Sequence, residues 1–254
     1  MSDRRDLVLF DVDGTLAQSG KQCSTAIVAM LQRLAKVDNI DLGVIDSNSL
    51  ETIRWQLSAG GAALRWLFAE NGLMTGDGTI HDSFDHAVGK EDQQHVIDLC
   101  LHWIANTRLP FKRDHVIELG VAIMHVTPIG WQCSAAERDR FSRLDSTHGF
   151  RLKLLRHLRA DKQFAAALQC CMDNHIGIDI YPAGFDKTYC WRHIAAADMQ
   201  YNRIYYINSG QARSSGAHLV GSPSNIQALE SSGPQHTLQL IDQQLVPRLV
   251  ASEK

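Results

Sequence analysis

Short apolar runs alternate with amphipathic segments at the start of this chain, and this order restricts the possible folds more than any other feature. The runs LVLF (7–10) and IDLGVI (40–45) have the composition of buried strands. Residues 24–36 and 50–57 repeat apolar side chains at helical spacing, and Ser49 stands where a helix N-cap is expected. Because a strand–helix–strand–helix order is typical of a parallel sheet covered by helices, we predict an α/β fold.

The middle of the chain follows another pattern. Residues 90–106 form a long amphipathic segment, and Ser134 followed by Glu137 is the capping-box signature of a helix start. The segments 164–172 and 177–182 favour a pair of strands. Helices and paired strands in this order indicate an α+β region rather than a continuation of the parallel sheet.

The alternating pattern returns after this middle region. A helix is expected from Lys187, followed by strands at 203–208 and 218–220 and a final helix at 237–245. The first and last parts of the chain would therefore share one sheet, with the middle region inserted between them.

Two domains follow from these changes of pattern. We predict a Rossmann-like parallel-sheet core domain made of residues 1–81 and 186–254. The residues between them, 82–185, would form an inserted α+β cap domain, with hinges near both of its ends.

Composition and charge exclude several classes of protein. With 44% hydrophobic and 21% charged residues and a net charge of −3, the chain is ordinary for a globular protein and carries no basic footprint for nucleic acid. No apolar run approaches the ~20 residues of a membrane span, and the opening run is too short for a signal peptide. Six cysteines without a CxxC pair favour reduced thiols, so we expect a cytoplasmic protein.

Two carboxylates, Asp11 and Asp13, directly follow the first predicted strand in the stretch DVDGT. In open parallel sheets ligands bind beyond the carboxyl ends of the strands, and two acids there can hold a divalent cation. One carboxylate can attack a phosphoryl group and form an aspartyl phosphate, while the second moves protons. Gly14 and Thr15 would allow a tight turn and present a hydroxyl group. Two solvated acids in a surface loop remain the alternative interpretation.

This motif and several others resemble the haloacid dehalogenase superfamily and, more closely, the eukaryotic-type phosphomannomutases. The resemblance extends over nearly the whole chain, through LFDVDGTL (9–16), ENGL (70–73), VTPIG (126–130), CSAAER (133–138) and DIYPAGFDKTYC (179–190). It implies interconversion of mannose 6-phosphate and mannose 1-phosphate with a hexose bisphosphate and Mg²⁺. It also implies a homodimer formed through the caps. The apolar stripe from Val96 to Trp103 would suit that interface, with core packing as the alternative.

The matching motifs assign roles to five residues. Asp11 resembles the nucleophile, and Asp13 resembles the general acid/base, which also ligates the metal through its carbonyl group. Lys187 resembles the lysine that neutralises the phosphoryl group and Asp11. In the cap, Arg138 and Asp179 match substrate-binding residues. A solvated helix position for Arg138 and a purely surface charge for Lys187 remain alternatives.

The metal motif departs from the family pattern. The family has Gly-Asp and later Asn-Asp after the strand that ends near residue 208, and here Ser209 and Ala217 stand in place of the two acids. Mg²⁺ prefers rigid octahedral oxygen sites with carboxylate charge. We therefore expect the metal site on Asp11 and Asp13 to be incomplete, with weak or absent Mg²⁺ binding.

The second motif is altered too. The family's Gly-Gly-Ser-Asp reads DSNS here, so that Asn48 replaces the expected serine and Asp46 adds a negative charge. Ser47 or Ser49 would substitute for the serine if the loop shifted by one residue. Alternatively, Asp46 would reach in and replace a lost metal ligand.

The cap has lost cations that grip the substrate phosphate in the family. Gly20, Gly120 and Trp131 stand where arginines are expected, which leaves Arg138 alone. Because each charge-assisted contact contributes about 1.5–3 kcal/mol, sugar-phosphate binding should be much weaker.

These departures lead us to expect a phosphomannomutase-like protein with weak or no mutase activity. Its role would be to bind a sugar phosphate or related small ligand, or to regulate an active mutase as its hetero-oligomeric partner. On its own it would form a homodimer through the cap. The alternative is an active phosphomannomutase or a sugar-phosphate phosphatase of the GDP-mannose pathway, working through an aspartyl phosphate on Asp11.

Overall fold

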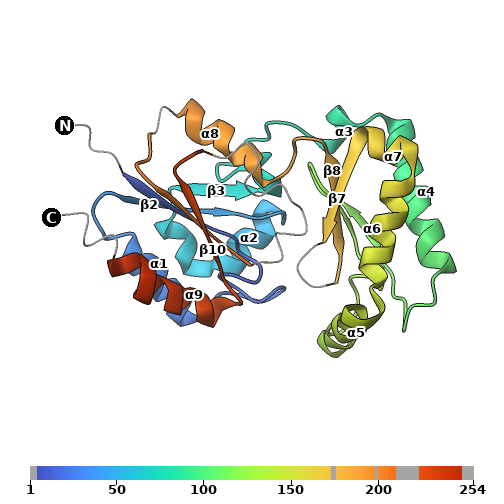
Figure 1. The fold of residues 1–254 in the computed structure, drawn as a ribbon, viewed down its shortest axis with the longest axis horizontal. Coiled ribbons are helices and arrows are strands. Elements are labelled where there is room, and N and C mark those ends of the chain that lie inside the picture. Colours follow the sequence, from blue (N-terminus) through green and yellow to red (C-terminus); the bar gives the residue numbers. More distant parts are fainter. Residues whose placement is uncertain (1–4, 173–175, 198–199, 210–222, 248–254) are drawn as a thin grey trace. The chain divides into compact units, whose positions relative to one another are not determined.

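The computed structural model describes residues 5–172, 176–197, 200–209 and 223–247. The described residues form two compact units (Figure 1). One contains those up to Thr79 and those from Lys187 onward, and the other contains Ile80–Asp186. Each unit has its own sheet and its own hydrophobic core.

The first unit is built on a six-stranded sheet with β1 near its centre. β1 pairs in parallel with β2 on one side and with β9 on the other, and only the short edge strand β4 runs antiparallel to its neighbour. The predicted α/β fold is therefore confirmed. In spatial order the strands are β10 (Ile226–Glu230), β9 (Ile204–Asn208), β1 (Asp6–Phe10), β2 (Ile40–Ile45), β3 (Trp66–Ala69) and β4 (Met74–Thr75).

Helices cover both faces of this sheet. The hydroxyl oxygens of Ser24 and Ser49 accept hydrogen bonds from backbone N–H groups in the first turns of α1 and α2, so serine caps fix where both helices begin. The strand predicted at 218–220 lies outside the described residues. The helices are α1 (Thr25–Leu34), α2 (Leu50–Leu57), α8 (Cys190–Ala196) and α9 (Pro234–Leu240, continued by a π-helical turn at Ile241–Leu245), with 3₁₀ turns at Ser58–Ala63, Glu70–Gly72 and Lys187–Tyr189.

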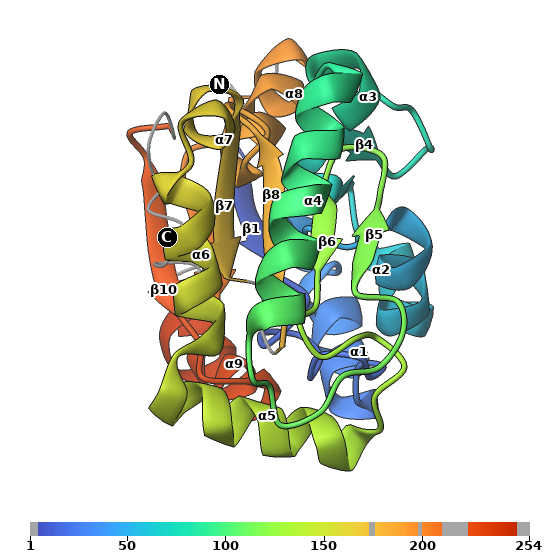
Figure 2. The same cartoon turned by 90° about the vertical axis from the view of Figure 1, so that its right-hand side faces the viewer.

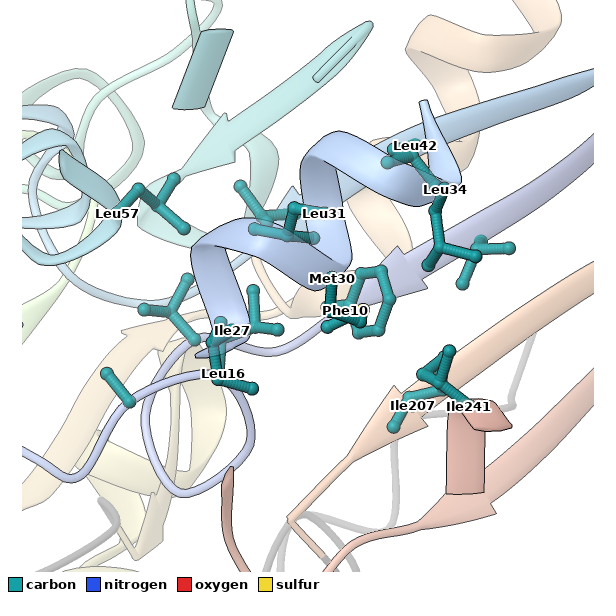
Figure 3. Close-up of a cluster of buried hydrophobic side chains, with 14 of the residues drawn as sticks. Phe10, Leu16, Ile27, Met30, Leu31, Leu34, Leu42, Leu57, Ile207 and Ile241 are labelled. Atoms are coloured by element: carbon teal, nitrogen blue, oxygen red, sulfur yellow. The ribbon is translucent and has the colours of Figure 1, made fainter. Parts of the chain in front are cut away.

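The apolar strand β1 is buried on both faces of the sheet. Val8 and Phe10 pack into the cluster beneath α1 and α9, while Leu7 and Leu9 pack into a second cluster with α8. Figure 3 shows the buried face of α1 against Phe10 of this strand. Burial on both faces explains why the strand reads as a continuous apolar run without alternation.

The second unit has an antiparallel four-stranded sheet with helices on one face. Figure 2 shows α4 and α6 next to each other over this sheet. The sheet order is β5 (Ile117–Leu119), β6 (Met124–Val126), β8 (Ile178–Pro182) and β7 (Leu168–Met172), and the helices are α3 (Phe84–Ala87), α4 (Lys90–Asn106), α5 (Ala135–His148), α6 (Phe150–Ala160) and α7 (Lys162–Ala167).

Local chemistry sets several boundaries in this unit. The predicted capping box is present, with Ser134 and Glu137 each bonding the other's backbone N–H. The strand predicted at 164–172 was too long, because Asp161 accepts a hydrogen bond from the Phe164 N–H and starts α7 there instead. β7 begins only after this helix ends.

The apolar stripe of α4 belongs to the core of the second unit. Val96 and Cys100 are buried there, and Leu99 and Trp103 pack against them. On the same helix Leu101 is 44% exposed. The stripe is thus used for core packing, which was the alternative to its use as an interface. None of the described helices has the length and apolar character needed to cross a membrane.

Candidate active site

The two aspartates predicted to act in chemistry lie at the carboxyl end of β1. The Asp11 N–H donates to the Ile207 carbonyl of β9 at 2.9 Å, which extends the pairing of the strands by one residue. Beyond it the chain turns sharply, because Gly14 has φ +73° and the Val12 carbonyl accepts three backbone hydrogen bonds from the residues that follow. Both carboxylates are buried, with Asp11 1% and Asp13 4% exposed.

Asp11 is held by a cation and a phenol. Lys187 Nζ donates to Asp11 Oδ1 at 2.9 Å, and the Tyr206 hydroxyl donates to the same oxygen. Burial raises the pKa of Asp11 above its usual value, while the Lys187 charge opposes that shift. Burial alone would lower the pKa of Lys187, but the nearby negative charges, with Asp11 foremost, and the hydrogen bond to Asp11 together outweigh it and raise that pKa well above the ordinary range. Lys187 is therefore a fixed positive charge beside the candidate nucleophile.

Asp13 is held by neutral donors. Gln56 Nε2 donates to Asp13 Oδ1 at 2.6 Å, and Asn48 Nδ2 donates to Oδ2 at 3.1 Å. Burial and the nearby charge of Asp46 raise the pKa of Asp13 to about 6. A carboxyl group with such a pKa exchanges its proton near neutral pH, as a general acid/base requires.

A third carboxylate, Asp46, enters the site from the end of β2 and is 1% exposed. Its Oδ2 accepts hydrogen bonds from the Val12 and Asp13 backbone N–H groups, both at 3.1 Å. Its Oδ1 accepts from the backbone N–H of Asn48 at 3.1 Å and from Asn48 Nδ2 at 3.0 Å. Asp46 does reach into the site, but its oxygens bind amide groups of the chain itself.

These hydrogen bonds bear on the Mg²⁺ ion that the resemblance implies. Mg²⁺ requires about six oxygen lone pairs in octahedral geometry, whereas oxygens of Asp11, Asp13 and Asp46 already accept hydrogen bonds from N–H and O–H donors. At the end of β9, beside Asp11, stand Asn208 and Ser209, which bring no carboxylate. Across the described part of the chain, no group of three or more histidine, cysteine or acidic residues is arranged to hold a metal ion. Among the described residues, Asn208 and Ser209 therefore supply no charge for Mg²⁺ at the end of β9, and Ala217 lies outside them.

In the second unit, Arg138 is bound to the loop that precedes its own helix. Its Nη2 donates to the Trp131 carbonyl at 2.8 Å, and its guanidinium carbon lies 5.5 Å from the centre of the Trp131 ring. This is a cation–π arrangement. Trp131, which replaces an expected arginine, thus engages the one predicted substrate cation that remains.

Asp179 has a histidine partner on the neighbouring strand. His125 of β6 lies directly opposite Asp179 of β8, and His125 Nδ1 is 2.8 Å from Asp179 Oδ1. Asp179 is 4% exposed. The two residues predicted to bind substrate, Arg138 and Asp179, therefore both have partners within their own unit.

Three polar neighbours of the candidate site residues were missed from the sequence. Tyr206, Gln56 and His125 contact Asp11, Asp13 and Asp179 respectively. Two of them interrupt an apolar pattern: Tyr206 lies in an apolar strand, and Gln56 lies between buried Ile53 and Leu57 on α2. A polar group on a buried face needs a partner, and that is the signal that could have found these two. His125 alternates with the two buried residues of β6, as polar residues commonly do in antiparallel strands, so the pattern carries no such signal for it.

Comparison with known proteins agrees with the motifs. A model of the eukaryotic phosphomannomutase family matches residues 27–246. The phosphomannomutase of Dendrobium officinale is 35% identical over 192 residues, which cover 74% of this chain and 75% of that protein. The phosphomannomutase of Schizosaccharomyces pombe is 34% identical over 197 residues, covering 75% of this chain and 76% of that protein.

The fold also agrees with a solved structure. A haloacid dehalogenase-like hydrolase from Bacteroides thetaiotaomicron matches with a TM-score of 0.55 and 12% identity, covering 94% of this chain and 99% of that one. At this identity the match concerns the fold alone. The predicted haloacid dehalogenase-like fold and the predicted family are both confirmed. The chain belongs to the eukaryotic phosphomannomutase family.

Proposed function

We propose that this family member has weak or no mutase activity and acts mainly by binding. The observation that carries the proposal is Ser209, which follows β9 where the family pattern has a metal-binding aspartate. Metal ions neutralise the charge that develops as a phosphoryl group is transferred, and this is a main source of rate in such reactions. With Ser209 in that place, Asp11 lacks the neighbouring acid that would help to hold the ion.

The charge balance of the site supports the same proposal. Three buried carboxylates, Asp11, Asp13 and Asp46, lie near one lysine, Lys187. An incoming phosphate ester carries negative charge of its own, so it would meet net repulsion at Asp11. Lys187 alone offsets only one of these charges.

The binding role that we propose has two forms. The protein binds a sugar phosphate or related small ligand, with Arg138 and Asp179 as the candidate contacts. It also associates through the cap, as a homodimer or with an active mutase. The exposed Leu101 and Leu119 of the second unit offer apolar surface for such contacts. We place this function in the cytoplasm, because free thiols suit a reducing compartment.

A second candidate function is slow phosphoryl transfer, as a mutase or as a phosphatase in which water is the acceptor. The Asp11–Lys187 ion pair at 2.9 Å favours it, because a cation beside the nucleophile is one part of such a site. Asp13, with its pKa of about 6, would supply the proton transfer. Under this alternative, aspartyl phosphate forms on Asp11.

Turnover of mannose 6-phosphate and of an aryl phosphate, each with Mg²⁺ and with a hexose bisphosphate for the mutase assay, separates the two candidates. The samples are the wild-type protein, Asp11→Asn and, as a matched control, Asp242→Asn, which removes an exposed carboxylate. We expect all three to release product at the same background rate. A wild-type kcat above about 1 s⁻¹, within the range ordinary for enzymes, would refute the proposal if Asp11→Asn abolished it.

Association is tested separately. The tagged protein is mixed with an active phosphomannomutase, and the complexes are measured by size-exclusion chromatography with light scattering. A mixed oligomer supports the hetero-oligomeric form, and a self-associated dimer alone supports the homodimer. A monomer that leaves the active mutase untouched contradicts both forms.

A further inference from the structure

We propose that Asp46 is a built-in occupant of an anion site formed by the Val12 and Asp13 backbone amides, so that this site takes a tetrahedral oxyanion only when the Asp46 carboxylate is absent. The inference deepens the proposed function, because it supplies a reason within the chain for low phosphoryl transfer. It concerns where an external anion would bind, and it requires no metal ion.

The contacts of Asp46 divide into a local pair and a distant pair. Those of Oδ1 go to Asn48, two residues further along, and an ordinary turn explains them. Those of Oδ2 go to Val12 and Asp13, which are more than thirty residues away in sequence and belong to another strand end. Local turn geometry does not account for this second pair.

The Val12 and Asp13 amides form a site suited to an anion. Consecutive N–H groups that point to one side bind anions, and a carboxylate oxygen here accepts from both at 3.1 Å. The same turn begins at Asp11, so an oxyanion held by these amides would lie beside the Asp11 carboxylate and Lys187. Asp46 therefore occupies the position that a phosphoryl oxygen would need.

Two buried donors at this edge of the sheet have no acceptor among the described residues. They are the Thr15 hydroxyl in the turn after Asp13 and Asn208 Nδ2 at the end of β9, and both residues are at most 2% exposed. Buried donors without partners are unfavourable and rare in folded proteins. An oxyanion brings several acceptor oxygens, whereas the Asp46 carboxylate brings two that are already used.

The backbone around Asp46 explains how its side chain is placed. The Asp46 N–H donates to the Phe68 carbonyl at 3.1 Å, and the Asp46 carbonyl accepts from the Asn71 N–H at 3.0 Å. These bonds anchor the residue from β3 and the turn after it. A carboxylate anchored this way competes with an external anion at the high effective concentration of an intramolecular partner.

The charge of Asp46 repels the two neighbouring acids, which points away from a purely structural role. Its charge adds to the burial that raises the pKa values of both Asp11 and Asp13. A neutral acceptor such as serine or asparagine would bond the local Asn48 amide without this repulsion. The carboxylate therefore supplies a negative charge that turn formation does not need.

The test is phosphate binding by the whole protein in EDTA, so that no metal contributes. Inorganic phosphate is titrated into the wild type, Asp46→Ser and Asp46→Asn, with Asp242→Ser as the control that changes net charge equally at an exposed site. Affinity is measured by calorimetry, and the bound position by the ¹H–¹⁵N shifts of the Val12 and Asp13 amides. We expect Asp46→Ser to bind phosphate at least tenfold more tightly than the wild type and to shift both amides. Asp46→Asn should fall between them, and Asp242→Ser should match the wild type.

Four results overturn the inference. They are equal phosphate affinity in the wild type and Asp46→Ser, no binding by Asp46→Ser, binding that leaves the Val12 and Asp13 amide shifts unchanged, and failure of both Asp46 variants to fold. The last result would show that the carboxylate is a structural requirement rather than a replaceable occupant. Hexose phosphate turnover by the wild type would instead refute the proposed function, and the phosphate titrations would still decide the role of Asp46.

Discussion

The acids clustered at the ends of β1 and β2 in the first unit are held differently from the buried acids of the second unit. In the first unit, the charge of Asp46 adds to the burial that raises the pKa values of Asp11 and Asp13, and Lys187 pairs with Asp11. In the second unit, buried acids have cationic or basic partners of their own: Asp145 pairs with Arg151, and Asp179 lies against His125.

This difference indicates what each unit uses its acids for. A capping carboxylate stabilises the helix that it begins, and a buried ion pair is strongly destabilising to break, so the acids of the second unit bear first on stability. A cluster of buried like charges lowers stability, and a fold keeps it only where packing elsewhere offsets the loss. Such clusters are typical of functional sites. Removing an acid from the cluster of Asp11, Asp13 and Asp46 and removing a paired or capping acid of the second unit should therefore have opposite effects on stability.

The largest expected effect is in the second unit, where Arg151→Ala should lower the free energy of unfolding by about 3–5 kcal/mol, because it leaves a buried carboxylate without its cation. Asp145 is 6% exposed and its Oδ2 lies 2.8 Å from Arg151 Nε. Urea unfolding measures the change. Arg143→Ala, at an exposed position of the same unit, is the control and should change stability by less than about 0.5 kcal/mol. Equal losses in the two variants would contradict the structural role of the pair.

The next largest effect is a pH dependence in the first unit. The pKa of Asp13 is about 6 in the folded protein against 3.8 for an ordinary aspartate. Between these values the folded state binds more protons than the unfolded state, so the wild type loses stability as the pH rises from about 4 to about 6. Asp13→Asn has no such proton. Its stability relative to the wild type should rise by about 2 kcal/mol from pH 4 to pH 7.

Asp161→Asn in the second unit is the matched control for this measurement. The hydrogen bond from the Phe164 N–H and the contact with His95 lower the pKa of Asp161. Its contribution is therefore complete above the ordinary aspartate pKa and is lost as the pH falls through the lowered value. The stability difference between Asp13→Asn and the wild type should change between about pH 4 and pH 6, because the pKa of Asp13 is raised. The stability difference between Asp161→Asn and the wild type should change below the ordinary aspartate pKa, because the pKa of Asp161 is lowered. If the stability difference between Asp13→Asn and the wild type does not change with pH, the pKa of Asp13 is not raised, and the contrast between the two units fails.

Much of the fold was predictable because local signals and burial agreed. The strand at 40–45, the helices at 50–57 and 90–106, and the capping box at Ser134 were all found from the sequence. The strand predicted at 164–172 is confirmed from Leu168, but its first four residues were misassigned because apolar residues suit a strand as well as a helix. The N-cap at Asp161 is what decides for a helix. In the sequence, a single N-cap residue is a weaker signal than the apolar run that follows it.

The sequence pointed to the acids and the lysine of the candidate site, and it missed their polar neighbours and their hydrogen bonds. The motif placed Asp11, Asp13 and Lys187, and the structure brings Lys187 to Asp11. The sequence left open whether Asp46 reaches the site. Its bonds to Val12 and Asp13 depend on how β1 and β2 align side by side, and that register is a property of the folded sheet.

A smaller loss of stability is expected at the N-cap residue of α7. Asp161→Ala should lower the free energy of unfolding by about 1 kcal/mol, because the Phe164 N–H loses its acceptor. Asp161→Asn keeps an acceptor at the same position and should lose much less at neutral pH. Thermal unfolding of the two variants measures the difference. Equal losses would mean that the charge of Asp161, rather than its cap, stabilises this helix.

The smallest expected effect concerns Arg138, the residue of the second unit that is also a candidate for substrate binding. Arg138→Lys keeps the charge but loses the planar guanidinium that donates to the Trp131 carbonyl and lies near its ring, so stability should fall by about 0.5 kcal/mol. Arg140→Lys, at an exposed position of the same helix, is the control and should have no effect. Both variants are melted with and without mannose 6-phosphate. If the ligand raises the melting temperature of Arg140→Lys but not of Arg138→Lys, then Arg138 binds substrate and the second unit also holds a functional charge. If the ligand acts equally on both, the Trp131 contact is structural, which places the functional charges of this protein in the first unit.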